Sequence, residues 1–277
     1  MSGPGTSGPG TSGPAVSGPA VSGRQGLVID HLTLRFGGLE ALSDVSLRIA
    51  PGTLYSVIGP NGAGKTSLFN CLTGYYRPTS GSVVYGGVDI TTRGSADVAA
   101  LGIRRTFQNI RLFPRLTAAE NVLAGAHLRS RSNVLGILLA GPRHRKAERA
   151  LADEAAQWLA FVGLERYAGE RAGELPYGVR KRMEVARALI GQPSMLLLDE
   201  PAAGVSSVER DELSDLIRRV SERGVTVVMI EHDVELVMRL ATEVAVLDHG
   251  RLIAQGPPAE VRRDEAVVRA YMGRKRR

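Results

Sequence analysis

The sequence predicts an α/β protein, a parallel sheet buried between helices, with a helix-rich middle section inserted as a helical subdomain. Three observations indicate this class. A short apolar strand at residues 54–58 runs directly into a glycine-rich turn and a helix that begins near Lys65. Two further apolar runs, at residues 195–198 and 225–230, have the aliphatic and β-branched character of strands buried on both faces. Helical patterns lie between these strands, which implies helices packed against a parallel sheet.

The composition is that of a globular protein with a basic surface. The chain has 277 residues, of which 43% are hydrophobic and 23% charged, enough for one large domain or two small ones. Its net charge of +7 and pI of about 9.9 suit a polyanion or an anionic membrane face, although a basic surface is more often merely a solvated one. The single cysteine, Cys71, excludes a disulfide within the chain and fits a reducing compartment.

The chain opens on a repeated five-residue unit, SGPGT twice and then SGPAV twice, which ends at Gly23. This segment carries no charge and has almost nothing to bury, so we expect residues 1–23 to form a disordered low-complexity tail. It lacks the basic region and the apolar block of a signal peptide. The longest apolar run of note, Val134–Ala140, is far shorter than the roughly 20 apolar residues of a membrane-spanning helix. We therefore expect that the protein does not cross a membrane by itself.

The first element after the tail is a half-buried strand that begins at Leu27. Polar and apolar residues alternate from His31 onward, which is the pattern of a strand with one buried face. The apolar set of this strand is Leu32, Leu34 and Phe36.

Three helices are predicted further along the chain. A capping box, Thr117-Ala-Ala-Glu120, opens the first, and residues 147–162 form the second. The third begins near Gly178, because apolar residues recur there at helical spacing, and it ends at Gly191 with a proline just beyond. The recurring residues are Val179, Met183, Ala186 and Ile190.

A phosphate-binding loop follows the strand at residues 54–58. The segment GPNGAGKT matches the pattern G-x-x-x-x-G-K-[ST] and lies between a strand and a helix, as this loop must. Its glycines let the backbone curl so that successive N–H groups point at phosphate oxygens, and the following helix adds its positive end. Lys65 then reaches the β- and γ-phosphates, and the Thr66 hydroxyl ligates Mg²⁺. The predicted nucleotide-binding residues are Gly59, Pro60, Asn61, Gly62, Ala63, Gly64, Lys65, Thr66 and Ser67.

Two carboxylates, Asp199 and Glu200, end the apolar strand at residues 195–198. Alone this is a weak signal, because strands often end in acidic residues. Paired with a phosphate loop it predicts a hydrolytic site: Asp199 holds Mg²⁺, directly or through water, and Glu200 orients and deprotonates the attacking water.

The helix that begins near Gly178 carries three cations in its first turn, Arg180, Lys181 and Arg182. Each exposed cation at the positive end of a helix costs roughly 0.3–1 kcal/mol. We interpret this cluster as a sign that an anion visits that helix start.

These motifs, in their order along the chain, resemble an ABC-type ATPase over residues 24–277. The resemblance gives a meaning to three residues that are uninformative alone, since Phe36 could be strand core, Gln108 any polar loop residue, and His232 a satisfied surface histidine. The series is Phe36, the phosphate loop, Gln108, a helix-start signature at residues 175–179, the pair Asp199-Glu200, and His232.

The resemblance implies a P-loop NTPase fold with a RecA-like core, an antiparallel β subdomain and a helical subdomain at about residues 110–190. Its ligands are ATP and Mg²⁺. Phe36 stacks on the adenine, Gln108 senses Mg²⁺ and the γ-phosphate, and His232 contacts the γ-phosphate. Two such ATPases pair head to tail, so that Gly178 of one subunit caps the γ-phosphate held in the other.

The chain is more narrowly similar to the G-type ATPase subunit of branched-chain amino acid importers. Three of the stretches that carry this similarity are FGGLEALSDVSL, RTFQNIRLFPRLTAAENVLAGAH and IEHDVELVM. This similarity implies uptake of branched-chain or other hydrophobic amino acids, powered by ATP at the cytoplasmic face of the inner membrane. The implied partners are two integral-membrane permease subunits, a second ABC ATPase in a heterodimer (a homodimer is the alternative) and an extracytoplasmic solute-binding protein, with no nucleic acid. The alternative functions are the ATPase of an exporter, for example of lipid, and a soluble ATPase that acts on nucleic acid or ribosomes.

The sequence departs from the family pattern at three positions. Pro176 replaces the usual serine of the helix-start signature, and Val179 replaces its glutamine. Ser206 stands where an aspartate or asparagine is expected after Glu200. These departures leave the chain's own hydrolytic residues intact and concern what it contributes to the partner's site.

The stretch at residues 129–149 combines the apolar run Val134–Ala140 with the basic residues Arg143-His144-Arg145-Lys146. We interpret it as a packed helix followed by a solvated basic loop. Contact with the permease or with anionic lipid headgroups is the alternative.

Overall fold

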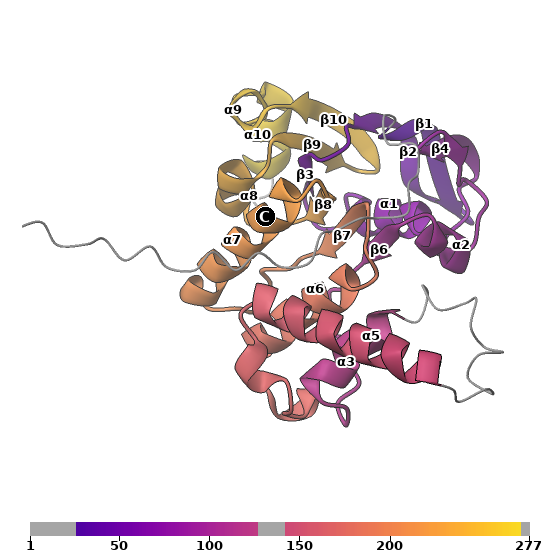
Figure 1. Ribbon diagram of the computed structural model, residues 1–277. Helices are drawn as coiled ribbons and strands as arrows, with labels where there is room; N and C mark the ends of the chain where they lie inside the picture. Colours follow the sequence, from indigo (N-terminus) through magenta and orange to yellow (C-terminus); the bar gives the residue numbers. More distant parts are fainter. Residues whose placement is uncertain (1–25, 127–141, 273–277) are drawn as a thin grey trace, which may run out of the picture.

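The structure, a computed structural model, describes residues 26–126 and 142–272, without the side chains of residues 142–145 and 272 (Figure 1). The expected tail, residues 1–23, and the apolar run Val134–Ala140 lie outside the described residues.

A six-stranded sheet forms the centre of the molecule, in the order β10-β9-β3-β8-β7-β6. Five of its strands run parallel, and β10 closes the edge antiparallel to β9. The strands are β3 (Leu54–Ile58), β6 (Ile103–Arg105), β7 (Met195–Asp199), β8 (Thr226–Ile230), β9 (Glu243–Asp248) and β10 (Arg251–Gly256).

A second, antiparallel sheet lies beside the first in the order β2-β1-β4-β5. Its first strand is half-buried as predicted, with Leu32 and Leu34 in the core, but Phe36 at its end is 45% exposed and therefore not a core residue. The four strands are β1 (Leu27–Phe36), β2 (Leu39–Ile49), β4 (Ser80–Tyr85) and β5 (Val88–Asp89).

Helices cover the parallel sheet and also form a separate group between β6 and β7 in sequence (Figure 1). In that group α3, α5 and α6 pack on one another around the fully buried Trp158 and Met183. The helices are α1 (Lys65–Leu72), α2 (Ser95–Ala100), α3 (Ala118–Ala124), α5 (Pro142–Phe161), α6 (Tyr177–Leu189), α7 (Ser207–Glu222), α8 (Val234–Leu240), α9 (Pro258–Val261) and α10 (Glu265–Met272), with short 3-10 turns at Glu165–Tyr167 and Ala172–Glu174. The α/β class predicted from the sequence, with a parallel sheet and a second, antiparallel one, is confirmed.

The parallel strands are buried on both faces, which is why their sequences read as unbroken apolar runs. In β7, Leu196 and Leu198 belong to the core cluster on the side of the helical group, whereas Leu197 belongs to the cluster on the side of the antiparallel sheet. The neighbouring strand β8 alternates in the same way, with Met229 on one side and Ile230 on the other.

The predicted helix starts are found with one exception. Thr117 and Glu120 form the reciprocal bonds of a capping box at the start of α3. The exception is α5, which begins at Pro142 and not near residue 147. The basic segment at residues 143–146 therefore lies in a helix, and the expectation of a loop there was wrong. Proline suits the first position of a helix because its φ is already helical and its missing N–H has no helical partner there.

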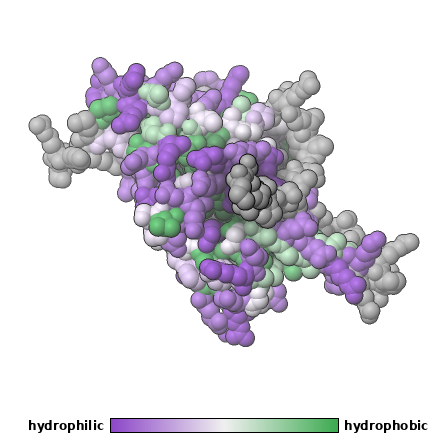
Figure 2. Space-filling view, turned by 60° about the vertical axis from the view of Figure 1, so that its left-hand side comes forward, coloured by the Kyte–Doolittle hydropathy of each residue, from purple (hydrophilic) through white to green (hydrophobic). Residues whose placement is uncertain are grey.

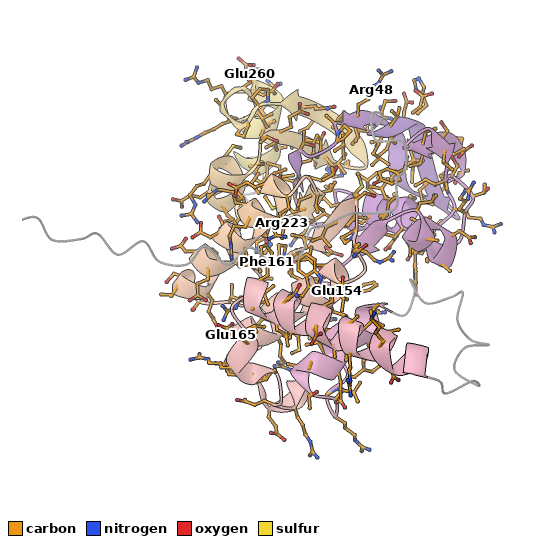
Figure 3. All side chains as sticks on the ribbon, in the orientation of Figure 1. Arg48, Glu154, Phe161, Glu165, Arg223 and Glu260 are labelled. Atoms are coloured by element: carbon orange, nitrogen blue, oxygen red, sulfur yellow. The ribbon has the colours of Figure 1, made fainter. Side chains whose placement is uncertain are left out.

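An aromatic contact joins the helical group to the helix that covers the sheet. The Arg223 guanidinium, just past the end of α7, lies 4.5 Å from the centre of the Phe161 ring at the end of α5 (Figure 3). A guanidinium over an aromatic face contributes about 0.5–1 kcal/mol at exposed sites. The ends of α5 and α7 are therefore held together.

The face of the molecule seen in Figure 2 is mainly hydrophilic. On the face shown in Figure 2, hydrophobic residues form only small patches between polar ones. Among the helices of the described residues, none has the length and apolarity needed to cross a bilayer.

The topology brings the ends of three parallel strands to one edge of the sheet. Asp199 at the end of β7 is paired with Ile230 of β8, and Val57 of β3 is paired with the same residue. Ligands of open α/β sheets bind at this carboxyl edge. The residues that follow these strands are therefore the first place to look for a site.

Candidate nucleotide site

A cleft of about 630 Å³ lies at the carboxyl edge of the sheet. It collects most of the residues singled out in the sequence, which come from positions as far apart as Phe36 and His232. The lining residues are Phe36, Leu39, Glu40, Ala41, Asn61, Gly62, Ala63, Gly64, Lys65, Thr66, Ser67, Gln108, Glu200 and His232.

The phosphate loop is a close-packed turn that requires glycine at two positions. Gly64 precedes α1 with a φ of 99°, and a Cβ there would lie 2.5 Å from the backbone oxygen of Ala41. Gly59 follows β3, and a Cβ there would lie 2.0 Å from the backbone oxygen of Leu247. No side chain caps α1, so the N–H groups of its first turn remain available for an anion.

Lys65 is folded back onto the phosphate loop. Its ammonium donates to the backbone oxygens of Gly59 at 2.6 Å and Pro60 at 3.0 Å, and the residue is only 7% exposed. These carbonyls place the cation beside the α1 N-terminus inside the cleft. A phosphate group bound at this helix N-terminus would form a charge-assisted hydrogen bond with the ammonium.

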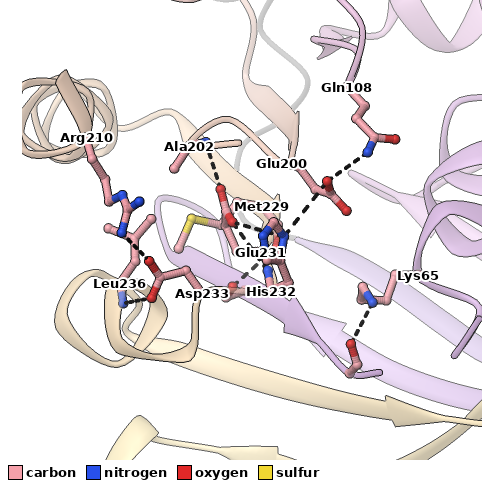
Figure 4. Close-up of polar contacts among 12 residues, drawn as sticks. Lys65, Gln108, Glu200, Ala202, Arg210, Met229, Glu231, His232, Asp233 and Leu236 are labelled. Carbon is pink, nitrogen blue, oxygen red and sulfur yellow. Dashed lines mark hydrogen bonds and ion pairs between the residues drawn. The ribbon is translucent and has the colours of Figure 1, made fainter. Parts of the chain in front are cut away.

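Three polar side chains from different loops meet over the cleft (Figure 4). The Gln108 amide nitrogen donates to Glu200 Oε2 at 2.8 Å, and His232 Nδ1 lies 3.9 Å from the same oxygen. Glu200 has a φ of 47°, in the left-handed region that costs a non-glycine residue about 1–3 kcal/mol. Strain of this kind persists where neighbouring bonds fix the backbone.

Asp199 does not line the cleft and is engaged in a buried ion pair. Its Oδ2 accepts from the Arg105 guanidinium at 2.6 Å, and the two side chains are 5% and 7% exposed. The same guanidinium donates to Asn70 Oδ1 at 2.6 Å. Arg105, which the sequence did not single out, therefore connects β6, the end of β7 and the helix of the phosphate loop.

The oxygen donors at the cleft suit a Mg²⁺ ion held mainly by a nucleotide. Thr66 and Gln108 line the cleft, and both carry a neutral oxygen that this ion accepts as a ligand. Within residues 26–126 and 142–272 there is no group of three or more His, Cys, Asp or Glu placed to hold a metal ion. Mg²⁺ sites in nucleotide-binding proteins use one or two protein ligands together with substrate phosphates and waters.

Gly178 lies outside the cleft, in the first turn of α6. A Cβ on Gly178 would lie 2.1 Å from Glu209 Oε1, so the carboxylate of α7 fills the space where a side chain would stand. The helix start therefore already has an anionic neighbour from its own chain.

The three cations after Gly178 all contact groups of their own chain, and two of them, Arg180 and Lys181, share the Tyr177 ring. Lys181 is 5% exposed and donates to the Gln108 backbone oxygen at 3.0 Å, while Arg182 pairs with Glu212 at 3.2 Å. Arg180 lies over the Tyr177 ring, 5.7 Å from its centre. The cluster thus serves at least three separate contacts within the chain, which the sequence pattern did not indicate.

The departures from the family signature have local structural roles. Pro176 stands at the N-cap of α6, where its side chain makes no capping bond. Ser206 is the N-cap of α7 and forms a capping box with Glu209, so it performs the capping that an aspartate or asparagine also performs. Val179 is buried, 5% exposed.

Comparisons with known proteins agree with this geometry. Residues 42–203 match the ABC transporter family, and residues 251–276 match the family described as branched-chain amino acid ATP-binding cassette transporter. The chain is 44% identical to the high-affinity branched-chain amino acid transport ATP-binding protein BraF of Pseudomonas aeruginosa, over 89% of this chain and 97% of that protein. It is 40% identical to the high-affinity branched-chain amino acid transport ATP-binding protein LivG of Escherichia coli, over the same shares of the two chains.

Solved structures give the same result for the fold. The ADP conformation of MJ1267, an ATP-binding cassette of an ABC transporter, superposes with a TM-score of 0.77 at 30% identity, over 89% of this chain and 98% of that one. The dimeric structure of MJ0796, a bacterial ABC transporter cassette, superposes with a TM-score of 0.70 at 26% identity, over 84% of this chain and 98% of that one. The phosphate loop, the carboxylate pair at the end of β7 and these relatives show that the chain belongs to the ABC transporter family. It is an ATP-binding subunit whose hydrolysis of ATP is coupled to transport.

Proposed function

We propose that the chain is the ATP-hydrolysing subunit of an importer of branched-chain or other hydrophobic amino acids. The observation that carries the proposal is the cleft itself, in which the phosphate loop, Gln108, Glu200 and His232 meet. Relatives named for branched-chain amino acid transport, matched over nearly their whole length, support the choice of solute.

ATP lies in this proposal along the phosphate loop. The N–H groups of the loop and of the first turn of α1 bind the phosphates, and Lys65 exchanges its contacts with the Gly59 and Pro60 carbonyls for β- and γ-phosphate oxygens. Phe36 offers an open ring face to the adenine, because the ring is 45% exposed and contacts Tyr76 edge-on at 5.1 Å between centres.

Hydrolysis requires a group that orients and deprotonates a water molecule. We assign this role to Glu200, whose carboxylate is 22% exposed in the cleft and accepts from Gln108. His232 lies on the other side of that carboxylate and donates to the γ-phosphate oxygens. Because Gln108 and His232 both approach Oε2, a shift of either loop changes the orientation of the base.

We assign Mg²⁺ to Thr66, Gln108 and Asp199. When bound, the ion supplies neutralisation of the charge on the β- and γ-phosphate oxygens. Arg105 bonds Oδ2 of Asp199, and the proposal leaves the other carboxylate oxygen, Oδ1, for the ion or for a water bound to it.

A second ATPase completes the site in this proposal, in a heterodimer, with Gly178 acting on the ATP of the partner. Gly178 does not line the cleft that contains the chain's own phosphate loop, so the proposal assigns its N–H group to a phosphate held by the partner. The dimeric MJ0796 cassette supports pairing as a property of this fold.

A small hollow of about 240 Å³ between β6, α3 and α6 offers a docking surface for the permease. Phe113 on its rim is 53% exposed, and Glu184 and Arg187 of α6 line it. Glu184 accepts from the Arg111 N–H at 2.8 Å, and Lys181 in the same helix holds the Gln108 backbone oxygen. We propose that these two bonds couple the hollow to Gln108, the residue that contacts Glu200.

The remaining parts of the proposal follow from this assembly. The subunit works as a peripheral protein at the cytoplasmic face of the membrane, with two permease subunits and an extracytoplasmic solute-binding protein, and without nucleic acid. Residues 24–277 form its ATP-binding domain, with a helical subdomain at about residues 110–190, and residues 1–23 form a tail outside it.

The test is solute uptake by the assembled complex in proteoliposomes with ATP inside. We expect uptake of radiolabelled leucine in the wild type and in the control Glu260→Gln, which changes an exposed carboxylate on α9, and no uptake in Glu200→Gln. ATP-dependent loss of solute from the side where ATP is hydrolysed would identify an exporter instead. Hydrolysis that no hydrophobic amino acid stimulates would contradict the solute class.

A further inference from the structure

Glu231 is a buried carboxylate that the proposed mechanism does not use. It follows β8 directly and precedes His232, but its residue exposure is only 1%, so it reaches neither solvent nor a nucleotide in the cleft. Burial raises the pKa of its carboxyl group, which shows that the position is unfavourable for a charge. A buried carboxylate is retained at such a place when its oxygens make bonds that an apolar residue cannot make.

The two oxygens of Glu231 bind two different loops (Figure 4). Oε1 accepts from the backbone N–H of Ala202 at 2.8 Å, two residues after Glu200. Oε2 accepts from the backbone N–H of His232 at 3.3 Å and lies 3.9 Å from the His232 ring nitrogen Nδ1. One carboxylate therefore joins the loop after β7 to the loop after β8.

The loop that Glu231 holds contains the strained residue Glu200. The Glu200 N–H donates to the Ile230 oxygen at 3.0 Å, and the Glu200 oxygen accepts from Ala203 at 3.2 Å. These two bonds close the turn, and the Ala202 bond fixes it to β8. A left-handed φ of 47° at Glu200 persists because the surrounding bonds determine it.

We propose that Glu231 is a positioning residue for hydrolysis, which sets the Glu200 and His232 side chains relative to each other through the backbones of the two loops. The inference rests on the proposed roles of Glu200 and His232 in this site. The quantity that Glu231 sets is the distance between the two groups, which is 3.9 Å from Glu200 Oε2 to His232 Nδ1. This distance depends on the positions of the two loops. Among the hydrogen bonds described above, those of Glu231 are the only side-chain bonds that join these loops.

The test compares turnover with nucleotide affinity. Glu231→Ala removes both acceptors, and we expect kcat of the assembled ATPase to fall about 10-fold to 100-fold, since a displacement of about 1 Å has effects of this size. The dissociation constant of ATP for the full-length isolated subunit should change less than about 2-fold, because Glu231 does not line the cleft and its oxygens bond the N–H groups of Ala202 and His232.

Thr226→Val is the matched control. Thr226 lies at the opposite end of β8, is 4% exposed, and its hydroxyl accepts from the Gly52 N–H at 2.9 Å. The substitution thus removes a buried side-chain acceptor of a backbone N–H from the same strand, away from the cleft. We expect a loss of thermal stability with unchanged kcat.

Two conservative variants keep the test decisive if Glu231→Ala does not fold. Glu231→Gln keeps the reach and one acceptor oxygen without the charge, whereas Glu231→Asp keeps the charge and is too short to reach both N–H groups. Positioning predicts a higher kcat for the Gln variant than for the Asp variant. The reverse order, or a kcat of Glu231→Ala within 2-fold of wild type while Glu200→Gln is inactive, would overturn the proposal. Full activity of Glu200→Gln would instead refute the role proposed for Glu200.

Discussion

The buried ion pair between Arg105 and Asp199 gives the sharpest prediction of stability. Replacing Arg105 by methionine removes the 2.6 Å bond to Asp199 and the 2.6 Å bond to Asn70. Methionine retains apolar contact with the rings of Phe69 and Phe107, whose centres lie 5.6 and 5.2 Å from the guanidinium carbon. The variant therefore isolates the electrostatic loss.

The magnitude follows from what remains in the core. Asp199 is 5% exposed and loses its cation, and breaking a buried pair in this way costs about 3–5 kcal/mol. For a domain of this size each kcal/mol lowers Tm by about 2–4 °C, so a fall of roughly 6–20 °C is expected. Adding Asp199→Asn should restore part of the loss, because a neutral amide requires no cation.

The assay is urea unfolding followed by circular dichroism, with calorimetry for Tm. Arg182→Met is the control, since it removes the partly exposed pair with Glu212, and such pairs contribute about 0–1 kcal/mol. The reasoning is refuted if Arg105→Met costs no more than Arg182→Met, or if Asp199→Asn brings no recovery.

Three further predictions concern the site and its surroundings. Lys65→Ala should lose ATP binding, whereas Glu200→Gln should keep ATP binding and lose turnover; nucleotide titration and phosphate release measure the two properties. Hydrolysis by Glu200→Gln at a rate near that of the wild type would exclude Glu200 as the base. Gly178→Asp should leave the ATP affinity of the isolated subunit intact and reduce the turnover of the assembled pair. It should also lower Tm by a few degrees, because the new Cβ displaces Glu209, whose capping of α7 contributes about 1 kcal/mol. Loss of ATP affinity in a folded isolated subunit would contradict the role assigned to Gly178. Burial raises the pKa of Glu184 above its ordinary 4.5, so the folded state binds that proton more tightly than the unfolded state, and the stabilisation present below pH 4.5 is lost as pH rises. The free energy of unfolding of the wild type should therefore fall relative to Glu184→Gln as the pH rises from about 4.5 through the raised pKa of the folded state, and a pH-independent difference would contradict this.

The sequence predicts those parts of the fold and of the site whose pattern is carried by residues that are consecutive in the chain. The phosphate loop, the apolar strands and the capping box at Thr117 each depend on neighbours within a few positions, and each is found where predicted. The position of Gln108 and His232 beside Glu200 came from a family resemblance, because no local pattern connects residues so distant.

The missed features depend on contacts between distant segments. Arg105 and Asp199 are 94 positions apart, and Glu231 and Ala202 are 29 apart. An acid at the end of a buried strand gives no sign of whether it lines a cleft, as Glu200 does, or bonds a neighbouring loop, as Glu231 does. Likewise the sequence shows three cations after Gly178 but not the separate partners that hold them.

The order of strands in the parallel sheet has a consequence for synthesis of the protein. β3, which leads into the phosphate loop, lies between β8 and β9, and its Ser56 bonds Met229 across 173 positions. At translation rates of about 5–20 residues per second, β3 waits roughly 9–35 s for its neighbours. During that time an apolar strand and the loop after it have no sheet to join. The nucleotide site is thus assembled only after β8 and β9 have been made, and a chain that ends before β8 cannot form it.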